Sequence, residues 1–365
     1  MKRDHTYYMT LAMKLALKAR GLTSPNPLVG AVVVKNGRII GKGYHERAGL
    51  AHAERIALDE AGPAAKGAVL YVTLEPCAHF GKTPPCVDRI IQSGIRRVVI
   101  GMSDPNPLNN GKGIKILQNH KIAVEAGFLE ERLRRMNEAF VKFITKRMPL
   151  VTVKVGQSLD GKIATRTGES KWITSDASRA YSHRLRQNFD AIMVGVNTIL
   201  RDDPKLEAWF ASRQPFKVVV DSTLSTPQNA KVFSNNARVI IATVPPAQSG
   251  QETENRKALS EKARVLAVKE KFGQVNLKDM LKKLARMDIT SILVEGGGTL
   301  IGSLFDEGLV DKIMFFVSPR IIGGKDAISS VMGKGVSRVD AAVELRDLRL
   351  RRLKDDFLIE GYVKK

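Results

Sequence analysis

Short apolar runs separated by turn residues occupy most of the first 146 residues, and they predict strands that alternate with helices. The runs typical of strands cover residues 28–34, 38–43, 69–74 and 97–101, and the patterns typical of helices cover residues 9–19, 52–61 and 86–93. Asn36-Gly37 separates the first two runs and is a strong signal for a β-hairpin. The alternation of strands and helices favours a layered α/β sheet.

The same alternation continues beyond residue 146. Further strands are predicted at residues 150–155, 191–195, 217–221, 238–243, 291–295 and 312–317. Ser175 can cap a helix that begins at Asp176. On that helix Arg179, His183 and Arg186 are spaced so that they share one face. A charged face of this kind is most often simply solvated, although its place after a loop rich in Gly, Ser and Thr is also compatible with phosphate binding.

A glycine-rich turn follows the strand predicted at residues 291–295. The sequence Gly296-Gly297-Gly298 leads into a helix, where free backbone N–H groups at the positive end of the helix dipole can cradle phosphates. This turn is not the GxGxxG fingerprint of Rossmann domains, so by itself it is only a weak indication of a phosphate site.

Length and composition set the class of protein. A chain of 365 residues exceeds the size at which a single hydrophobic core keeps growing, so two domains are expected. Hydrophobic residues make up 43% of the chain, and no apolar run approaches the length of a membrane span. Lys14 and Lys18 interrupt the apolar residues near the N-terminus, which predicts an amphipathic helix there rather than a signal peptide. We therefore expect a soluble protein without a membrane partner.

The net charge of +22 is shared equally between the two parts, with +11 in residues 1–146 and +11 in residues 147–365. The sequence has neither a basic tail nor a basic run interleaved with aromatic residues of the kind that stack on bases. Attraction of phosphorylated small molecules explains this charge. We expect no specific nucleic-acid partner.

Cys77 and Cys86 are the only cysteines of the chain, and both follow His52 and Glu54. One imidazole and two thiolates give Zn²⁺ three protein ligands and leave one coordination position open, as in catalytic zinc sites. Glu54 is not needed as a ligand and can act as the general acid and base of a zinc deaminase. A cysteine pair alone is often apolar filling and a His-x-Glu triplet occurs by chance, but together they predict this chemistry. Two thiolates leave no cysteine for a disulfide, which implies a reducing, cytoplasmic compartment.

The motifs around these residues resemble the deaminase half of the bifunctional deaminase/reductase family of riboflavin biosynthesis. The matching segments are Ser24-Pro25-Asn26-Pro27-Leu28-Val29-Gly30, Gly43-Tyr44-His45, His52-Ala53-Glu54, Pro76-Cys77, Thr83-Pro84-Pro85-Cys86 and Asp104-Pro105-Asn106-Pro107. In that family the second cysteine follows a TPPC segment, as here, whereas tRNA adenosine and cytidine deaminases have a shorter PCxxC spacing. The family acts on a ribosylaminopyrimidine 5′-phosphate. The resemblance implies that the residues holding this substrate are Asn26, His45, His79, Lys82, Asp104 and Asn106.

The second part of the chain resembles the NADPH-dependent reductase domain of the same family, which has a dihydrofolate-reductase-like fold. The matching segments are Ser158-Leu159-Asp160-Gly161, residues 168–174, His183-Arg184-Leu185-Arg186, residues 190–204, Val220-Asp221-Ser222, Glu295-Gly296-Gly297-Gly298 and Pro319. The resemblance implies that NADPH contacts Gly156, Trp172, Thr198, Asp202, Leu206, Ser222, Gly297, Gly298, Thr299, Leu300, Ile301, Gly302 and Ser303. It implies that the substrate contacts Lys154, Ser170, Arg186 and Glu295.

One position departs from the pattern of the family. Three residues after Leu206 the family usually has an arginine that binds the substrate phosphate, whereas this chain has Trp209. Tryptophan cannot pair with a phosphate through charge. We therefore expect either weakened substrate binding or a replacement by Arg213.

Two domains and two consecutive reactions are the resulting prediction. The resemblance implies a cytidine-deaminase-like α/β/α domain in residues 1–146 and a dihydrofolate-reductase-like α/β domain in residues 147–365. The first would remove an exocyclic amine with Zn²⁺, and the second would reduce the ribosyl group to a ribityl chain with NADPH. The resemblance also implies a homo-oligomer, either a dimer or a tetramer. Two alternatives stay open: a zinc deaminase of nucleic acid or a free base with an accessory dehydrogenase-like domain, and a silent module that uses zinc only for folding.

Overall fold

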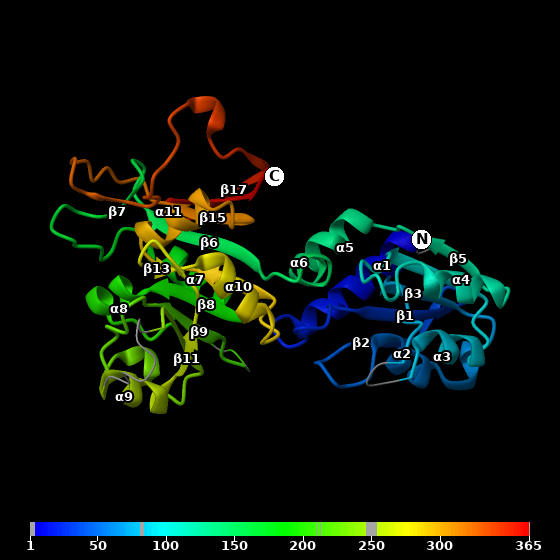
Figure 1. Ribbon diagram of the computed structural model, residues 1–365. Coiled ribbons are helices and arrows are strands. Elements are labelled where there is room, and N and C mark those ends of the chain that lie inside the picture. Colours follow the sequence, from blue (N-terminus) through cyan, green and yellow to red (C-terminus); the bar gives the residue numbers. More distant parts are fainter. Residues whose placement is uncertain (1–3, 81–83, 210, 212, 246–253, 365) are drawn as a thin grey trace. The chain divides into compact units, whose positions relative to one another are not determined.

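Two compact units make up the chain in the computed structural model, which describes residues 4–80, 84–209, 211, 213–245 and 254–364 (Figure 1). One unit covers Met1–Met148 and the other covers Pro149–Lys365. Each unit has its own sheet and its own hydrophobic core. Among the described helices, none is both long and apolar enough to cross a membrane.

The first unit is built on one mixed sheet. Its strands are β1 (Gly30–Lys35), β2 (Arg38–Tyr44), β3 (Val69–Leu74), β4 (Arg97–Met102) and β5 (Ala123–Ala126), and its helices are α1 (His5–Ala16), α2 (Ala53–Ala61), α3 (Cys86–Gln92), α4 (Lys112–Asn119), α5 (Glu130–Met136) and α6 (Glu138–Lys146). In space the order is β2-β1-β3-β4-β5. Strand β1 is antiparallel to both of its neighbours, and β3, β4 and β5 are parallel.

Glycines allow two helices to pack directly on the backbone of this sheet. A Cβ at Gly43 would lie 2.5 Å from the carbonyl oxygen of Ala53 in α2, and a Cβ at Gly30 would lie 2.0 Å from that of Ala12 in α1. Because Gly43 pairs with Ala31, the neighbour of Gly30 in the strand, α1 and α2 lie on opposite faces of the sheet (Figure 1). This close packing fixes the N-terminus of α2, where a metal ligand is predicted.

The second unit contains a larger sheet. Its strands are β6 (Leu150–Gln157), β7 (Lys162–Ala164), β8 (Ala191–Gly195), β9 (Phe216–Val220), β10 (Val239–Thr243), β11 (Arg264–Ala267), β12 (Glu270–Lys271), β13 (Gln274–Val275), β14 (Ser291–Val294), β15 (Lys312–Val317), β16 (Ile328–Ser329), β17 (Leu345–Leu353) and β18 (Asp356–Val363). Its helices are α7 (Asp176–Arg186), α8 (Val196–Asp202), α9 (Glu254–Lys262), α10 (Leu277–Ala285) and α11 (Gly298–Asp306).

The order of the main sheet, within the described ranges, is β11-β10-β9-β8-β14-β6-β15-β18-β17. Neighbouring strands are parallel from β11 to β15, and β18 and β17 extend the sheet antiparallel. Parallel strands end at the same edge of a sheet, so the segments that follow β8, β9 and β14 lie close together. A site for a ligand is expected at that edge.

Most of the predicted elements are present, and the differences have local causes. The hairpin at Asn36-Gly37 is confirmed, and α7 begins at Asp176 with Ser175 accepting a hydrogen bond from a backbone N–H. Helix α1 begins earlier than residue 9, because Asp4 accepts a hydrogen bond from the Tyr7 N–H and caps it. The sequence pattern did not reveal the β17–β18 hairpin, because the leucines of β17 do not alternate regularly with polar residues and the strand pairing is interrupted between Arg346 and Arg349.

Candidate active sites

His52, Cys77 and Cys86 lie together in the first unit. His52 is the N-cap residue of α2, Cys86 is the first residue of α3, and Cys77 lies in the loop after β3. The Nδ1 atom of His52 is 3.2 Å from Cys86 Sγ and 3.5 Å from Cys77 Sγ. All three potential ligand atoms lie within 4.8 Å of one another. The structure thus brings together the side chains that the sequence predicts as zinc ligands.

The distances and the chemistry of this cluster fit a zinc ion. Zinc lies about 2.3 Å from a thiolate sulfur and about 2.0 Å from an imidazole nitrogen, so two ligands of a tetrahedral site are roughly 3.5 Å apart. A hydrogen bond from the Cys86 thiol lowers the pKa of Cys77 to about 4. The backbone N–H of Cys86 also donates to Cys77 Sγ, at 3.3 Å. Cys77 is therefore ready to bind a metal as a thiolate.

Glu54 lies beside this cluster with a buried side chain. Only 4% of Glu54 is exposed, and its carboxyl group interacts with the Cys86 thiol. Burial, helped by the negative charge of Cys77, raises the pKa of Glu54 to about 7. A carboxyl group that titrates near neutral pH can both accept and donate a proton, as general acid–base chemistry requires.

Asn26 and His45 contact each other next to the cluster. Asn26 Nδ2 lies 3.1 Å from His45 Nε2, and His45 Nδ1 lies 3.1 Å from the carbonyl oxygen of Ala51. Because the carbonyl can only accept, Nδ1 carries the proton and Nε2 accepts from the Asn26 amide. Burial lowers the pKa of His45, in keeping with a neutral ring. The rings of His45 and His52 lie edge to face with centroids 5.5 Å apart, so two predicted substrate contacts adjoin the metal ligands.

Asp104 and Asn106 lie in a loop that supports the segment around Cys77. Asp104 Oδ1 accepts a hydrogen bond from the Asn106 N–H at 2.9 Å, and Oδ2 accepts one from the Asn109 side chain at 3.1 Å. Asn109 is completely buried and also accepts a hydrogen bond from the Ala78 N–H at 2.8 Å. Sequence analysis missed Asn109, because its link to Ala78 spans 31 residues and no local pattern marks it.

Glu75 is a second residue that sequence analysis missed. It is 2% exposed, and its carboxylate accepts hydrogen bonds from the N–H groups of Asp104, Gly111 and Ile114 at 3.1, 3.0 and 3.3 Å. It therefore links two later segments to the end of β3, two residues before Cys77. An acidic residue at the end of a buried strand was the available signal.

The other predicted deaminase contacts lie nearer the surface. His79 is exposed in the segment between the two cysteines, and Asn106 is half-buried. Lys82 lies outside the described residues.

Lys154, Arg186 and Glu295 form an ion-pair cluster in the second unit. Arg186 donates to both carboxylate oxygens of Glu295, at 2.7 and 2.9 Å, and Lys154 Nζ lies 3.5 Å from Glu295 Oε2. Burial alone would raise the pKa of Glu295, but the charges of Arg186 and Lys154 lower it to about 2. Glu295 is therefore an anion at neutral pH that holds two cations in place.

Trp209 packs on this cluster through His183. The two rings are stacked, with centroids 4.0 Å apart and planes 4° from parallel. The guanidinium of Arg186 lies 3.2 Å from His183 Nδ1, and burial lowers the pKa of His183. An aromatic surface thus stands where the sequence pattern of the resembled family has an arginine.

Arg213 does not replace that arginine. Its Nη1 lies 4.0 Å from Asp190 Oδ1, and Asp190 immediately precedes β8. Glu295 follows the opposite end of the parallel strand β14. The length of a strand separates Arg213 from the ion-pair cluster, so the expectation that Arg213 takes over the phosphate contact is wrong.

A cavity of about 520 Å³ opens beside the N-terminus of α11. Its lining includes six of the residues predicted to contact NADPH, namely Thr198, Ser222, Gly297, Thr299, Leu300 and Ser303. Thr198 Oγ1 accepts a hydrogen bond from the Gly297 N–H at 3.3 Å, which fixes the glycine turn. Free N–H groups in the first turn of α11 suit the phosphates of a dinucleotide.

Gly298, Ile301 and Gly302 do not belong to the described lining of this cavity. A Cβ at Gly298 would lie 2.3 Å from the carbonyl oxygen of Ser329, and a Cβ at Gly302 would lie 0.9 Å from that of Met332. Ile301 is 2% exposed. The two glycines thus let α11 pack closely against Ser329 and Met332.

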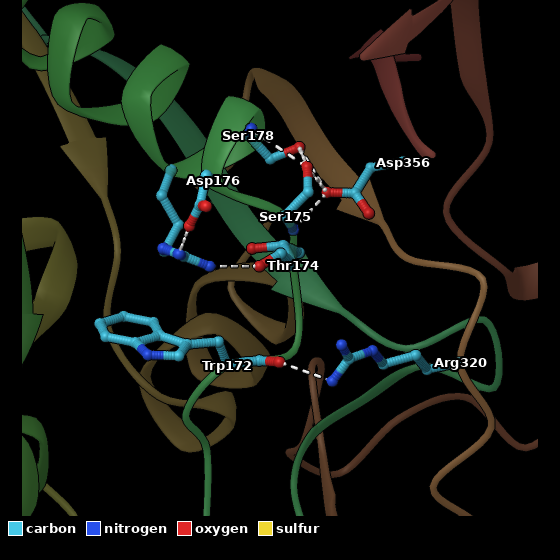
Figure 2. Close-up of polar contacts among 8 residues, drawn as sticks. Trp172, Thr174, Ser175, Asp176, Ser178, Arg320 and Asp356 are labelled. Carbon is cyan, nitrogen blue, oxygen red and sulfur yellow. Dashed lines mark hydrogen bonds and ion pairs between the residues drawn. The ribbon is translucent and has the colours of Figure 1, made fainter. Parts of the chain in front are cut away.

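Trp172 lies in the loop before α7, which Arg320 and Asp356 contact (Figure 2). Arg320 donates to the Trp172 carbonyl oxygen at 2.8 Å. The guanidinium of Arg179 lies 4.2 Å from the centre of the indole ring. Asp356 accepts a hydrogen bond from the Ser175 hydroxyl at 2.7 Å. The loop is thus fixed while 61% of Trp172 stays exposed.

The remaining predicted contacts of the reductase site are more scattered. Gly156 lies in β6, where a Cβ would lie 3.3 Å from Thr174 Cγ2. Ser170 is half-buried in the loop before α7, and Asp202 is exposed at the end of α8. Leu206 is 3% exposed and belongs to the hydrophobic core.

Two family models match the chain in the order of its two units. The model described as the cytidine and deoxycytidylate deaminase zinc-binding region matches residues 2–102. The model described as the RibD C-terminal domain matches residues 149–359.

Similar proteins match nearly the whole length. The riboflavin biosynthesis protein RibD of Aquifex aeolicus is 46% identical over 96% of both chains, and that of Escherichia coli is 37% identical over 96% of this chain and 97% of its own. The Thermotoga maritima structure of a diaminohydroxyphosphoribosylaminopyrimidine deaminase/5-amino-6-(5-phosphoribosylamino)uracil reductase has a TM-score of 0.86 at 37% identity and 98% coverage of both chains. The predicted fold class, with a cytidine-deaminase-like first unit and a dihydrofolate-reductase-like second unit, is confirmed.

Proposed function

The chain belongs to the RibD family of riboflavin biosynthesis proteins, and from this premise we propose that residues 1–146 and residues 147–365 catalyse two consecutive reactions. The first hydrolyses the exocyclic amine of diaminohydroxyphosphoribosylaminopyrimidine, and the second reduces 5-amino-6-(5-phosphoribosylamino)uracil with NADPH. The chain is thus a zinc-dependent deaminase and an NADPH-dependent reductase. The observation that carries this conclusion is the cluster of His52, Cys77 and Cys86 with Glu54 beside it.

In the first site, His52 Nδ1 and the sulfurs of Cys77 and Cys86 would hold the zinc ion. When bound, zinc supplies the Lewis acidity that makes water a nucleophile at neutral pH. Glu54 accepts the proton that the attacking water loses, and it then gives a proton to the departing amine so that ammonia leaves. Burial of Glu54 keeps this proton away from bulk water.

The substrate contacts of this site are Asn26, His45, His79, Lys82, Asp104 and Asn106. The contact between Asn26 and His45 fixes an amide and a neutral imidazole beside the metal ligands, where they can hydrogen-bond to the pyrimidine or the ribose. His79 and Lys82 belong to the segment between the two cysteines, and their imidazole and ammonium groups can hydrogen-bond to the ribose phosphate.

In the second site, Glu295 holds Arg186 and Lys154 at the carboxyl-terminal edge of the parallel strands. Their N–H groups orient the oxygens of the substrate, and Ser170 adds a hydroxyl group from the loop before α7. When bound, NADPH supplies the hydride that reduces C1′ of the ribosyl group. The glycine turn and the first turn of α11 hold the phosphates of the cofactor.

The substitution Glu54→Gln tests this assignment, because it removes the proton-transferring group and keeps its shape. We expect the variant to lose ammonia release, to keep its zinc, and to reduce the supplied uracil intermediate at the wild-type rate. Glu46→Gln, at an exposed position, is the matched control and should keep both activities. Ammonia release and NADPH absorbance measure the two reactions separately.

Three results would contradict the proposal. Loss of both activities in Glu54→Gln would exclude two independent sites. Absence of deamination by the zinc-loaded wild type would exclude the first reaction. Deamination of oligonucleotides without any turnover of the nucleotide substrate would favour a nucleic-acid deaminase instead.

Partners and location follow from the same chemistry. The protein acts on phosphorylated small molecules in the cytoplasm, where NADPH is available and thiols stay reduced.

It works as a dimer or tetramer, and the apolar side chains exposed near the C-terminus support this: Val339 is 92%, Leu350 68% and Leu348 60% exposed. Light scattering after size-exclusion chromatography measures the mass, and a monomer at micromolar concentration would contradict the oligomer.

A further inference from the structure

The cavity beside α11 extends past the predicted cofactor contacts. Its lining also includes Lys271 and Phe272 from the β12–β13 hairpin, Glu307 at the end of α11, and Lys334. The sequence pattern assigned none of these residues to a site.

The expected positions of the nicotinamide and of the pyrophosphate give the direction in which NADPH lies in the cavity. The nicotinamide has to reach the substrate beside Glu295, and Glu295 is two residues from Gly297, where the pyrophosphate meets the N-terminus of α11. The nine residues of α11 span about 13 Å. Ser303 and Glu307, on the later part of this helix, line the same cavity. The adenosine half of the cofactor therefore extends along α11 toward the β12–β13 hairpin.

An aromatic ring and a cation meet at this end of the cavity. Phe272 is 88% exposed, and Lys334 Nζ lies 5.7 Å from the centroid of its ring. An exposed phenyl face at the edge of a cavity suits stacking on an adenine. A neighbouring ammonium group suits a phosphate on the attached ribose.

Two acidic residues, Asp306 and Glu307, also line this end of the cavity. Glu307 forms an ion pair with Lys271 at 2.8 Å, which cancels its charge. Asp306 accepts a hydrogen bond from the Lys334 N–H at 2.8 Å, so it holds the Lys334 segment in place. Among the described carboxylates, none forms an ion pair with the ammonium group of Lys334. This cation is therefore available to an anionic ligand.

We propose that Phe272, Lys334 and Lys271 form the subsite for the 2′-phosphoadenosine part of the cofactor. Phe272 stacks on the adenine, Lys334 binds the 2′-phosphate, and Lys271, which Glu307 holds in place, donates a further hydrogen bond to that phosphate. This subsite selects NADPH over NADH, because the two cofactors differ only in that phosphate. The proposal rests on the reductase function and names the residues that make it specific.

Isothermal titration calorimetry of the full-length protein tests this subsite without turnover. The probes are NADPH, NADH and 2′,5′-ADP. We expect Lys334→Ala to raise the Kd for NADPH and for 2′,5′-ADP about tenfold, the usual loss for one charge-assisted hydrogen bond, and to leave the Kd for NADH unchanged. Lys334→Arg should keep most of the affinity for NADPH. Phe272→Ala should weaken NADPH and NADH equally, because both contain adenine.

The matched control is Lys278→Ala, which removes the same charge at an exposed position of α10 outside the described lining. It should bind all three probes like the wild type. Thermal melting of each variant identifies any misfolding, and Lys334→Met replaces Lys334→Ala if that variant melts early.

Three results would contradict the proposed subsite. Equal weakening of NADPH and NADH by Lys334→Ala would overturn the phosphate contact. Unchanged NADPH binding in both Lys334→Ala and Lys271→Ala would overturn the subsite while the reductase function stands. A wild type that binds neither nicotinamide cofactor would overturn the reductase function and the subsite together.

Discussion

Arg186 and Glu295 form a two-point ion pair in the second unit, with nitrogen–oxygen distances of 2.7 and 2.9 Å. The same guanidinium donates to the carbonyl oxygen of Glu207 at 2.8 Å and contacts the ring of His183. One side chain therefore ties α7, the segment after α8 and the turn after β14 together. These segments meet where substrate and cofactor have to meet, so the ion pair is both a structural link and part of the site.

Protonation of Glu295 should destabilise the second unit in acid. Burial alone would raise its pKa, but Arg186 and Lys154 lower it to about 2 from the usual 4.5. A carboxyl group with a lower pKa in the folded state stabilises that state fully above the unfolded pKa, and this stabilisation is lost as the pH falls toward the folded pKa. The difference corresponds to about 3 kcal/mol of unfolding free energy, which should disappear between about pH 5 and pH 2.

Guanidinium denaturation between pH 7 and pH 3 measures this effect. Glu295→Gln should lower the unfolding free energy at pH 7 by about 3 kcal/mol, because it leaves a buried guanidinium without its partner. Its stability should then depend less on pH than that of the wild type. Glu261→Gln, at an exposed position of α9, should behave like the wild type. The same pH dependence in Glu295→Gln and the wild type would refute the assignment.

Restoring a cation at position 209 should strengthen binding of the reductase substrate. Trp209 is 46% exposed and stacks on His183 next to the ion-pair cluster, so an arginine there could reach a phosphate. We expect Trp209→Arg to lower the KM for the phosphorylated substrate about fivefold with little change in kcat. Steady-state kinetics with NADPH in excess measures both constants.

Two controls separate a phosphate contact from a general change of the site. The dephosphorylated substrate should gain nothing from Trp209→Arg, since it offers no anion. Arg213→Ala should leave the KM of the phosphorylated substrate unchanged, because Arg213 is held by Asp190 at the other end of β8. An equal gain for both substrates would argue against the phosphate contact.

Asn109 should be needed for zinc affinity, although it is not a ligand. Its buried side chain links Asp104 to the Ala78 N–H, directly after the ligand Cys77. We expect Asn109→Ala to cost about 2 kcal/mol of stability and to weaken zinc binding about tenfold. Competition with a chelating dye measures the affinity. Asn110→Ala, at the exposed neighbouring position, is the control and should bind zinc normally; equal affinities of the two variants would exclude the supporting role.

The sequence was sufficient to predict those strands and site residues that are marked by a local sequence pattern. The strands β3, β8 and β15 have the ends that their apolar runs predict, and the zinc ligands are recognisable by type and spacing. A buried strand requires a run of apolar residues, and a metal site requires side chains with donor atoms. Both requirements can be recognised in short stretches of sequence.

The residues and contacts that the sequence did not predict depend on segments that are far apart along the chain. Glu75 and Asn109 support the Cys77 segment through partners that only the fold brings near. The stacking of Trp209 on His183 and the approach of Lys334 to Phe272 join segments separated by many residues. The periodicity of the sequence does not predict such pairs, because the two partners lie far apart along the chain.

Gly302 and Thr299 should affect the cofactor site in different ways, although both lie in the glycine-rich segment. A Cβ at Gly302 would lie 0.9 Å from the Met332 carbonyl oxygen, whereas Thr299 lines the cavity. Gly302→Ala should therefore push the Met332 segment away, cost about 2 kcal/mol of stability and also move Lys334. Thr299→Ala should weaken NADPH binding with no loss of stability. Thermal melting and NADPH titration of both variants distinguish the two roles, and a fully stable Gly302→Ala would show that the helix and the Met332 segment are not in tight contact.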